Sequence, residues 1–177
     1  MPIRITGGFL RGRLVASPRT SKTRPTGAKA REALFNILQD VSDFRVLDLF
    51  AGSGIVGIEF LSRGAKSVVA VEKNFSQARS LEASYLSLGI SDSLSLRTTD
   101  AVNFLEKALV AKERFDFIYA DPPFTESYPD LRPFLELLRP SGIAVFEVPS
   151  RNIPEWAKLG RIRPYGESSL VFFRATL

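Results

Sequence analysis

Four acidic residues stand where predicted strands end, and together they form a candidate binding site. They are Asp48, Glu72, Asp100 and Asp121, separated by 24, 28 and 21 residues. These separations are typical of successive strand and helix units, which in a parallel sheet bring their carboxyl ends to one edge. Ligands of open α/β sheets bind outside that edge. The row of acids therefore predicts a ligand site there, although each acid alone is also a common helix cap.

The first acid precedes a glycine turn in the sequence VLDLFAGSGIVG at 46–57. Apolar residues, then small ones, then helical spacing predict a buried strand, a tight turn and a helix. Glycine at 52 and 54 lets the backbone approach a ligand that faces the N–H groups of the helix start. GSGIVG also matches the G-x-G-x-x-G dinucleotide pattern. However, a carboxylate at Asp48 would repel a pyrophosphate, which favours a cationic or polyhydroxy ligand.

The chemistry of these side chains assigns a role to each. Glu72 comes 18 residues after Gly54, where a carboxylate can accept both hydroxyl protons of a ribose. Asp100 can accept from the exocyclic amine of an adenine, and Asp48 can pair with an ammonium group or orient the glycine turn. The three roles together describe a nucleoside with a positively charged amino-acid tail. They require no metal.

A second candidate site, Asp121-Pro122-Pro123-Phe124, follows the predicted strand FDFIYA. The prolines hold a rigid turn whose carbonyl groups are acceptors, and the carboxylate and the flat ring flank it. Such acceptors suit an aromatic amine, because bonding its N–H groups aims the nitrogen lone pair at an electrophile. A nucleic acid base must be flipped out or unpaired to reach them. These four residues are the candidate catalytic residues, and the alternative is a turn that caps the next helix.

Composition excludes several other kinds of chemistry. The 177 residues include no cysteine and no histidine, so disulfides, thiolate zinc sites, cysteine nucleophiles and imidazole bases are excluded. The apolar fraction is 45%, and no run approaches the ~20 apolar residues of a membrane span. We therefore expect one soluble α/β domain in the cytoplasm, without a secretory signal or a membrane partner.

Positive charge is concentrated in the N-terminal fifth of the chain. Residues 1–31 carry eight basic side chains and no acidic one, whereas the rest of the chain carries 16 basic and 19 acidic ones. A segment of charge +8 on a body of charge −3 predicts an appendage that binds a polyanion. We assign residues 1–25 to this basic appendage, a hairpin and a loop, and residues 26–177 to the catalytic domain.

The elements that position these residues follow from hydrophobic spacing. Residues 3–15 predict a short hairpin, and Thr26 can cap a helix that runs to about Gln39. The apolar face of this helix is predicted to be Ala30, Ala33, Leu34, Ile37 and Leu38. We expect that face to pack on the main domain.

From residue 45 onward, predicted strands alternate with predicted helices, which favours a mainly parallel sheet with right-handed crossovers. The chain ends with two strands joined by a tight turn, so the last strand should be antiparallel. The predicted strands are 45–49, 67–71, 94–98, 115–120, 143–148, 160–165 and 168–175. The predicted helices are 54–63, 75–88, 101–110 and 129–138.

Several motifs of the chain resemble those of a known enzyme family. DLFAGSG, the VEK at 71–73, Asp100-Ala101 and DPPF resemble amino-group methyltransferases that use S-adenosylmethionine. RITGGFLRGR near the N-terminus, with RPT and REALFNIL at 24–38, narrows the resemblance to the bacterial RsmD type, which methylates N2 of a guanine in small-subunit ribosomal RNA. The resemblance implies a class I methyltransferase fold: a Rossmann-like, mainly parallel seven-stranded sheet with an antiparallel last strand, plus a small N-terminal hairpin and helix.

The resemblance also implies ligands and site residues. S-adenosylmethionine is the expected cofactor, S-adenosylhomocysteine is its product, and Asp121 to Phe124 would hold the guanine. The expected partner is 16S ribosomal RNA within the small subunit or its assembly intermediate, bound by a monomer. The implied cofactor-binding residues are Asp48, Phe50, Gly52, Ser53, Gly54, Glu72, Lys73, Asp100 and Ala101. The implied RNA-binding residues are Arg4, Arg11, Arg13, Lys22, Arg24, Thr26 and Arg31.

Three alternatives stay open on the residues alone. The methyl acceptor can be adenine N6 or another nucleic acid amine, because Asp121 does not discriminate between exocyclic amines. The GSGIVG turn can instead serve a nicotinamide-dependent oxidoreductase. Finally, the chain can be an RNA-binding domain without catalytic activity.

Overall fold

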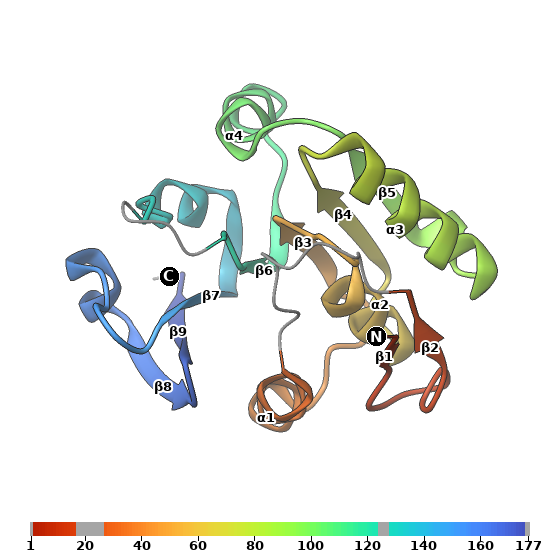
Figure 1. The fold of residues 1–177 in the computed structure, drawn as a ribbon. Coiled ribbons are helices and arrows are strands. Elements are labelled where there is room, and N and C mark those ends of the chain that lie inside the picture. Colours follow the sequence, from red (N-terminus) through yellow and green to blue (C-terminus); the bar gives the residue numbers. More distant parts are fainter. Residues whose placement is uncertain (1, 17–26, 124–127, 176–177) are drawn as a thin grey trace.

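The computed structural model describes residues 2–16, 27–123 and 128–175, and its centre is a seven-stranded sheet (Figure 1). The strands lie in the order β5-β4-β3-β6-β7-β9-β8. The first five in this order are parallel, and β9 is antiparallel to both of its neighbours. The predicted α/β class, the mainly parallel sheet and its antiparallel last strand are confirmed. The strands are β3 (Arg45–Leu49), β4 (Ser67–Val71), β5 (Leu94–Arg97), β6 (Phe115–Ala120), β7 (Leu138–Pro149), β8 (Arg161–Tyr165) and β9 (Ser168–Arg174).

Apolar side chains form two cores, one on each face of the sheet. In β3, Val46 belongs to one core and Leu47 to the other, so the strand is buried on both faces. Three α-helices, α1 to α3, contribute to the first core, and α4 with the 3₁₀ helices η2 and η3 contributes to the second. The helices are α1 (Ala28–Leu38), α2 (Ile55–Ser62), α3 (Phe75–Ser87), α4 (Ala101–Val110), η1 (Ser91–Ser93), η2 (Arg132–Leu137) and η3 (Glu155–Leu159). Across the described ranges, no helix combines the length and apolar character that crossing a membrane requires.

A small hairpin of β1 (Ile3–Arg4) and β2 (Leu14–Val15) lies beside α2 (Figure 1). The hydroxyl of Ser62, at the end of α2, donates to the carbonyl oxygen of Gly7 at 2.6 Å. Gly8 has a φ of +74°, and a Cβ there would lie 1.8 Å from the backbone oxygen of Ser62, so this close approach requires glycine. The predicted hairpin is therefore present and is fastened to the C-terminal end of α2.

The helix predicted over 129–138 is wrong. The structure instead has η2 over Arg132–Leu137 and begins β7 at Leu138 rather than at residue 143. Pro133 stands in the first turn of η2 and Pro140 follows its end, so about two α-helical turns at most fit between the prolines. An α-helix that short has little stability of its own, and the chain adopts the tighter 3₁₀ turn before the strand.

The buried face of α1 also differs from the predicted one. Ile37, which was expected to face the core, is 46% exposed, while Arg31 and Phe35 are buried. Arg31 faces inward because it pairs with the buried Glu59 of α2. Apolar spacing carries no information about such a pair. The predicted cap, Thr26, lies outside the described residues.

Candidate active site

A cleft of about 940 Å³ opens where the parallel strands end. Its lining comes from the ends of β3, β4, β6 and β7, the start of α1, and the turn between β8 and β9. The sequence predicted a site at this edge, and the volume suits a nucleoside-sized ligand with room for a second group. The predicted cofactor residues that line the cleft are Asp48, Phe50, Gly52, Ser53, Glu72, Lys73 and Ala101.

Glu72 ties together the two loops that follow β3 and β4. The backbone N–H of Gly52 donates to its Oε2 at 2.9 Å, and the N–H of Asn74 donates to its Oε1 at 2.8 Å. Each carboxylate oxygen has a second lone pair for a further donor. The backbone therefore holds this carboxylate in place, where it can accept hydroxyl groups from a ligand in the cleft.

The glycine turn has left-handed backbone at Phe50, Gly52 and Gly54, with φ values of 58°, 53° and 74°. Phe50 is the strained member, because a side chain disfavours this conformation. Gly54 does not line the cleft. A Cβ there would lie 2.7 Å from Cγ of Leu81, so this glycine allows α3 to pack close behind the turn.

Asp48 lies beneath the glycine turn and is 2% exposed. Its Oδ2 accepts the N–H of Gly57 at 3.1 Å. Burial raises the pKa of Asp48 to about 7, with a further contribution from the charge of Glu72 and an opposing one from the Gly57 hydrogen bond. The hydroxyl of Tyr85 is buried without a hydrogen-bond partner among the described residues, and burial together with the charge of Asp48 raises the pKa of Tyr85. A cationic ligand group would stabilise ionised Asp48.

Asp121 follows β6 and lines the same cleft, together with the two prolines after it. Phe124 lies outside the described residues. Burial raises the pKa of Tyr128, and the charges of Asp121 and Glu147 raise it further. The structure therefore brings the predicted acceptor turn and the glycine turn to one cleft.

Two buried polar residues of the cleft, Tyr119 in β6 and Glu147 in β7, were not predicted. The Tyr119 hydroxyl donates to Oε2 of Glu147 at 2.5 Å, and both residues are almost fully buried. Their signal in the sequence is a polar residue inside an apolar strand, where burial requires a partner. The prediction searched only for acids at strand ends and so missed them. It also missed the turn at 165–168, because nothing local in that sequence indicates a ligand.

Asp100 is not part of the cleft lining. It is exposed, and its Oδ1 accepts the N–H of Val102 at 2.9 Å as the N-cap of α4. Its contacts are those of the helix-cap alternative, and the next residue, Ala101, lines the cleft instead. The two roles share one sequence pattern, an acid between a strand and a helix.

Two basic side chains of the hairpin line a hollow that adjoins the cleft. Arg4, Arg11 and Arg13 are exposed. Arg4 and Arg11 line a second hollow of about 620 Å³, which shares Gly27 and Ala28 with the main cleft. Lys22, Arg24 and Thr26 lie outside the described residues.

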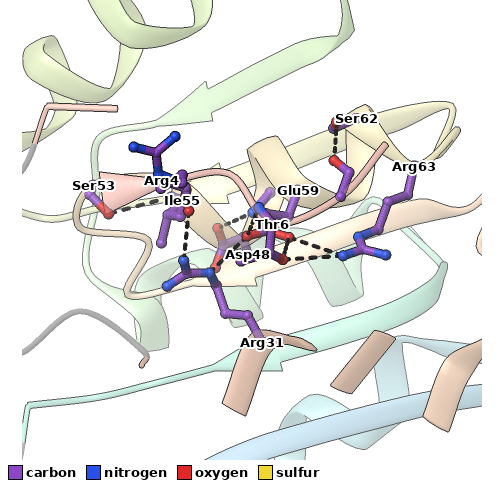
Figure 2. Close-up of polar contacts among 11 residues, drawn as sticks. Arg4, Thr6, Arg31, Asp48, Ser53, Ile55, Glu59, Ser62 and Arg63 are labelled. Carbon is purple, nitrogen blue, oxygen red and sulfur yellow. Dashed lines mark hydrogen bonds and ion pairs between the residues drawn. The ribbon is translucent and has the colours of Figure 1, made fainter. Parts of the chain in front are cut away.

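Arg31 must be corrected from an RNA-binding residue to a buried structural one. It is 2% exposed, its Nε donates to Oε1 of Glu59 at 2.9 Å, and another nitrogen donates to the backbone oxygen of Arg4 at 2.9 Å. Figure 2 shows Thr6 and Arg63 converging on the same carboxylate. A buried carboxylate needs such compensation, so Arg31 joins α1 to α2 and the hairpin.

The cleft is acidic although the chain as a whole is basic. Five carboxylates and two ammonium groups line it, from Asp48, Glu72, Asp121, Glu147 and Glu167 and from Lys29 and Lys73. This balance favours a cationic ligand and disfavours a pyrophosphate, which argues against a nicotinamide dinucleotide. Within the described ranges there is no group of three or more acidic side chains that could hold a metal ion.

Comparison with known proteins gives matches over nearly the whole chain. The family model described as "Conserved hypothetical protein 95" matches residues 3–174. The ribosomal RNA small subunit methyltransferase D of Haemophilus influenzae is 35% identical over 124 residues, which are 69% of this chain and 64% of that protein, so the match spans less than two thirds of that relative. A hypothetical protein of Thermus thermophilus has a TM-score of 0.83 at 30% identity, covering 98% of this chain and 99% of its own. The SAM-dependent methyltransferase from Agrobacterium tumefaciens shares the fold, with a TM-score of 0.68 at 16% identity over 88% of this chain and 64% of its own.

Proposed function

Because the chain belongs to the conserved hypothetical protein 95 family, the RsmD-type methyltransferases, we propose that it transfers a methyl group from S-adenosylmethionine to N2 of a guanine in 16S ribosomal RNA. The observation that carries this proposal is that the acid-lined glycine turn and the Asp121 turn share one cleft. One turn suits a cationic nucleoside and the other suits an aromatic amine. A single cleft can therefore hold the donor and the acceptor of a methyl transfer side by side.

The residues at the glycine turn fit S-adenosylmethionine, which supplies an electrophilic methyl group on a cationic sulfur that leaves with the bonding electrons as a neutral thioether. Glu72, held by two backbone N–H groups, would accept the ribose hydroxyls. Asp48 has few donors of its own and would be stabilised by the positive charge above it. Gly52 lets the backbone approach the ligand without a side chain in the way.

The turn at Asp121 would hold the acceptor amine. Pro122 and Pro123 have no N–H, so the carbonyl groups of the turn and the carboxylate offer only acceptors. Two acceptors on the two N–H groups favour a pyramidal nitrogen whose lone pair points at the methyl group. Once the new N–C bond has formed, the nitrogen proton is acidic, and Asp121 would accept it.

The basic hairpin would bind the RNA backbone in a manner independent of sequence. Arg4, Arg11 and Arg13 are exposed and suited to phosphate contacts. The target guanine would be unpaired or flipped out, since a stacked base cannot enter the cleft. The partner would be the small ribosomal subunit or an assembly intermediate, bound more weakly as salt rises.

The experiment is methyl transfer to small subunits from cells that lack the protein, followed by mass-spectrometric nucleoside analysis. We expect one new N2-methylguanosine, and Asp121→Ala should lower kcat by about 100-fold or more while S-adenosylhomocysteine binding in calorimetry stays unchanged. Asp92→Ala, an exposed aspartate outside the cleft, is the matched control. A methyl group on adenine N6 would favour the alternative acceptor, and binding of NAD in place of S-adenosylhomocysteine would favour the oxidoreductase.

A further inference from the structure

Glu147 is a buried carboxylate in the cleft to which the proposed methyl transfer assigns no role. We propose that Glu147 selects guanine as the acceptor base by accepting the N1–H of its Watson–Crick edge. The inference rests on the proposed function and adds to it the residue that selects the base.

Sheet register places Glu147 beside the acceptor turn. The parallel pairing of β6 and β7 ends with Ala120 opposite Phe146, so the next residues along the two strands are Asp121 and Glu147. Neighbouring strands are about 4.8 Å apart, and residues in register point to the same face. Both residues line the cleft. Two carboxylates therefore follow one another's register on neighbouring strands, in a position to face neighbouring donors of one base.

The carboxylate of Glu147 is held in position and has acceptor capacity left. Tyr119 donates to its Oε2 at 2.5 Å, and the hydroxyl of Tyr128 donates to its backbone oxygen. No described residue donates a hydrogen bond to its Oε1. This oxygen is also not fully buried, so a ligand in the cleft can reach it. A carboxylate with one side-chain donor in a nearly dry position gains from a further donor.

Guanine supplies that donor, and the other amino bases do not. Guanine presents N1–H next to its N2 amine, so two neighbouring donors face two neighbouring acceptors. Adenine N1 and cytosine N3 are acceptors beside an exocyclic amine, and each would turn a lone pair toward the carboxylate. A site built to bond one donor rejects an analogue without it by large factors, on the order of 10⁴ in favourable cases.

The first test needs no variant. Small subunits are reconstituted with guanine or with 2-aminopurine at the methylated position, because 2-aminopurine keeps the C2 amine but has no N1–H. The wild-type protein should methylate guanine at least about 100-fold faster in kcat/KM. Equal rates for the two bases would overturn the role of Glu147 while leaving the proposed function intact.

The second test changes the carboxylate. Glu147→Gln should lower kcat/KM for guanine by about 100-fold and shrink the ratio of guanine to 2-aminopurine to about tenfold or less, because its amide N–H can donate to an N1 lone pair. Calorimetric binding of S-adenosylhomocysteine should not change. Glu136→Gln, an exposed glutamate, is the control, and it should leave both rates and their ratio unchanged.

A purely structural role for Glu147 predicts a different pattern. In that case Glu147→Gln lowers the rates for both bases by the same factor, which would overturn the inference. Tyr119→Phe loosens the carboxylate without removing it, so it should lower the guanine rate by about tenfold and keep the base ratio high. If wild-type protein methylates adenine N6 or no base at all, the proposed function fails as well, and the two failures are thereby distinguished.

Discussion

Two buried carboxylates contact α2, Glu59 as one of its residues and Asp48 through the N–H of Gly57, and they differ in how their charge is compensated. Glu59 is 0% exposed and accepts from Arg31, from Arg63 and from both the backbone and the hydroxyl of Thr6 (Figure 2). Asp48 is 2% exposed, and among the described residues its hydrogen-bond donor is the N–H of Gly57. Both are buried acids, yet only Asp48 lines the cleft.

The difference separates an acid that supports the fold from an acid that faces the cleft. A carboxylate with a full set of donors is stable without any ligand, and Glu59 therefore joins the hairpin, α1 and α2. The charge of Asp48 has little compensation for its burial, and this burial raises the pKa of Asp48 to about 7. A buried acid with few donors beside a cleft is therefore a stronger candidate for a binding role than a buried acid with a full set of donors.

The largest expected effect is the loss of stability caused by Glu59→Gln. The substitution leaves Arg31 buried beside a neutral amide, so the free energy of unfolding should fall by about 3–5 kcal/mol in urea titrations followed by circular dichroism. Glu113→Gln is the control, because Glu113 pairs with Arg45 at a partly exposed site and should cost less than about 1 kcal/mol. Equal losses for the two variants would contradict a structural role for Glu59.

Asp48→Asn tests the role of the second acid through the pH dependence of stability. The pKa of Asp48 is about 7 in the folded protein and about 3.9 in an unfolded chain, so the folded state holds the extra proton between these values. Wild-type stability should therefore fall as pH rises from about 4 to about 7, by at most about 1.4 kcal/mol per pH unit from this group. The asparagine variant should lack that decline in urea titrations across the window. An unchanged slope would show that Asp48 is not the titrating group.

The smallest expected effect concerns the hydroxyl of Tyr85, which is influenced by the charge of Asp48. Tyr85→Phe removes a buried hydroxyl for which the described residues offer no partner, so it should stabilise the fold by about 1 kcal/mol. Tyr119→Phe removes a paired hydroxyl and should destabilise the fold by a similar amount. Thermal unfolding of both variants at one pH measures the contrast. A loss of stability in Tyr85→Phe would mean that its hydroxyl has a partner after all.

Sequence reasoning worked best where burial on both faces left a continuous apolar run. The bounds of β3, β4 and β6 agree with the predicted 45–49, 67–71 and 115–120, because charged residues flank β4 and β6 and the glycine turn follows β3. It failed at 129–138, where leucine and phenylalanine spacing also fits a 3₁₀ turn entering a strand. Spacing alone cannot register that prolines bracket the segment too closely for an α-helix.

The site was predictable where topology alone decides position. Acids after parallel strands must reach one edge, and Asp48, Glu72 and Asp121 do line the cleft. Asp100 lies outside the lining because a capping acid and a ligand-facing acid have the same sequence pattern. Arg31 was misplaced since a charge count treats every arginine as exposed, and its partner Glu59 is 28 residues away along the chain.

The turn between β8 and β9 lines the same cleft as the glycine turn, although more than a hundred residues separate the two along the chain. During translation, a nascent chain that has already folded its first parallel strands would still lack this wall. The complete cleft can thus exist only after the hairpin of β8 and β9 has emerged and β9 has paired with β7. Premature termination upstream of residue 165 should yield a product that keeps the glycine turn yet has an incomplete pocket.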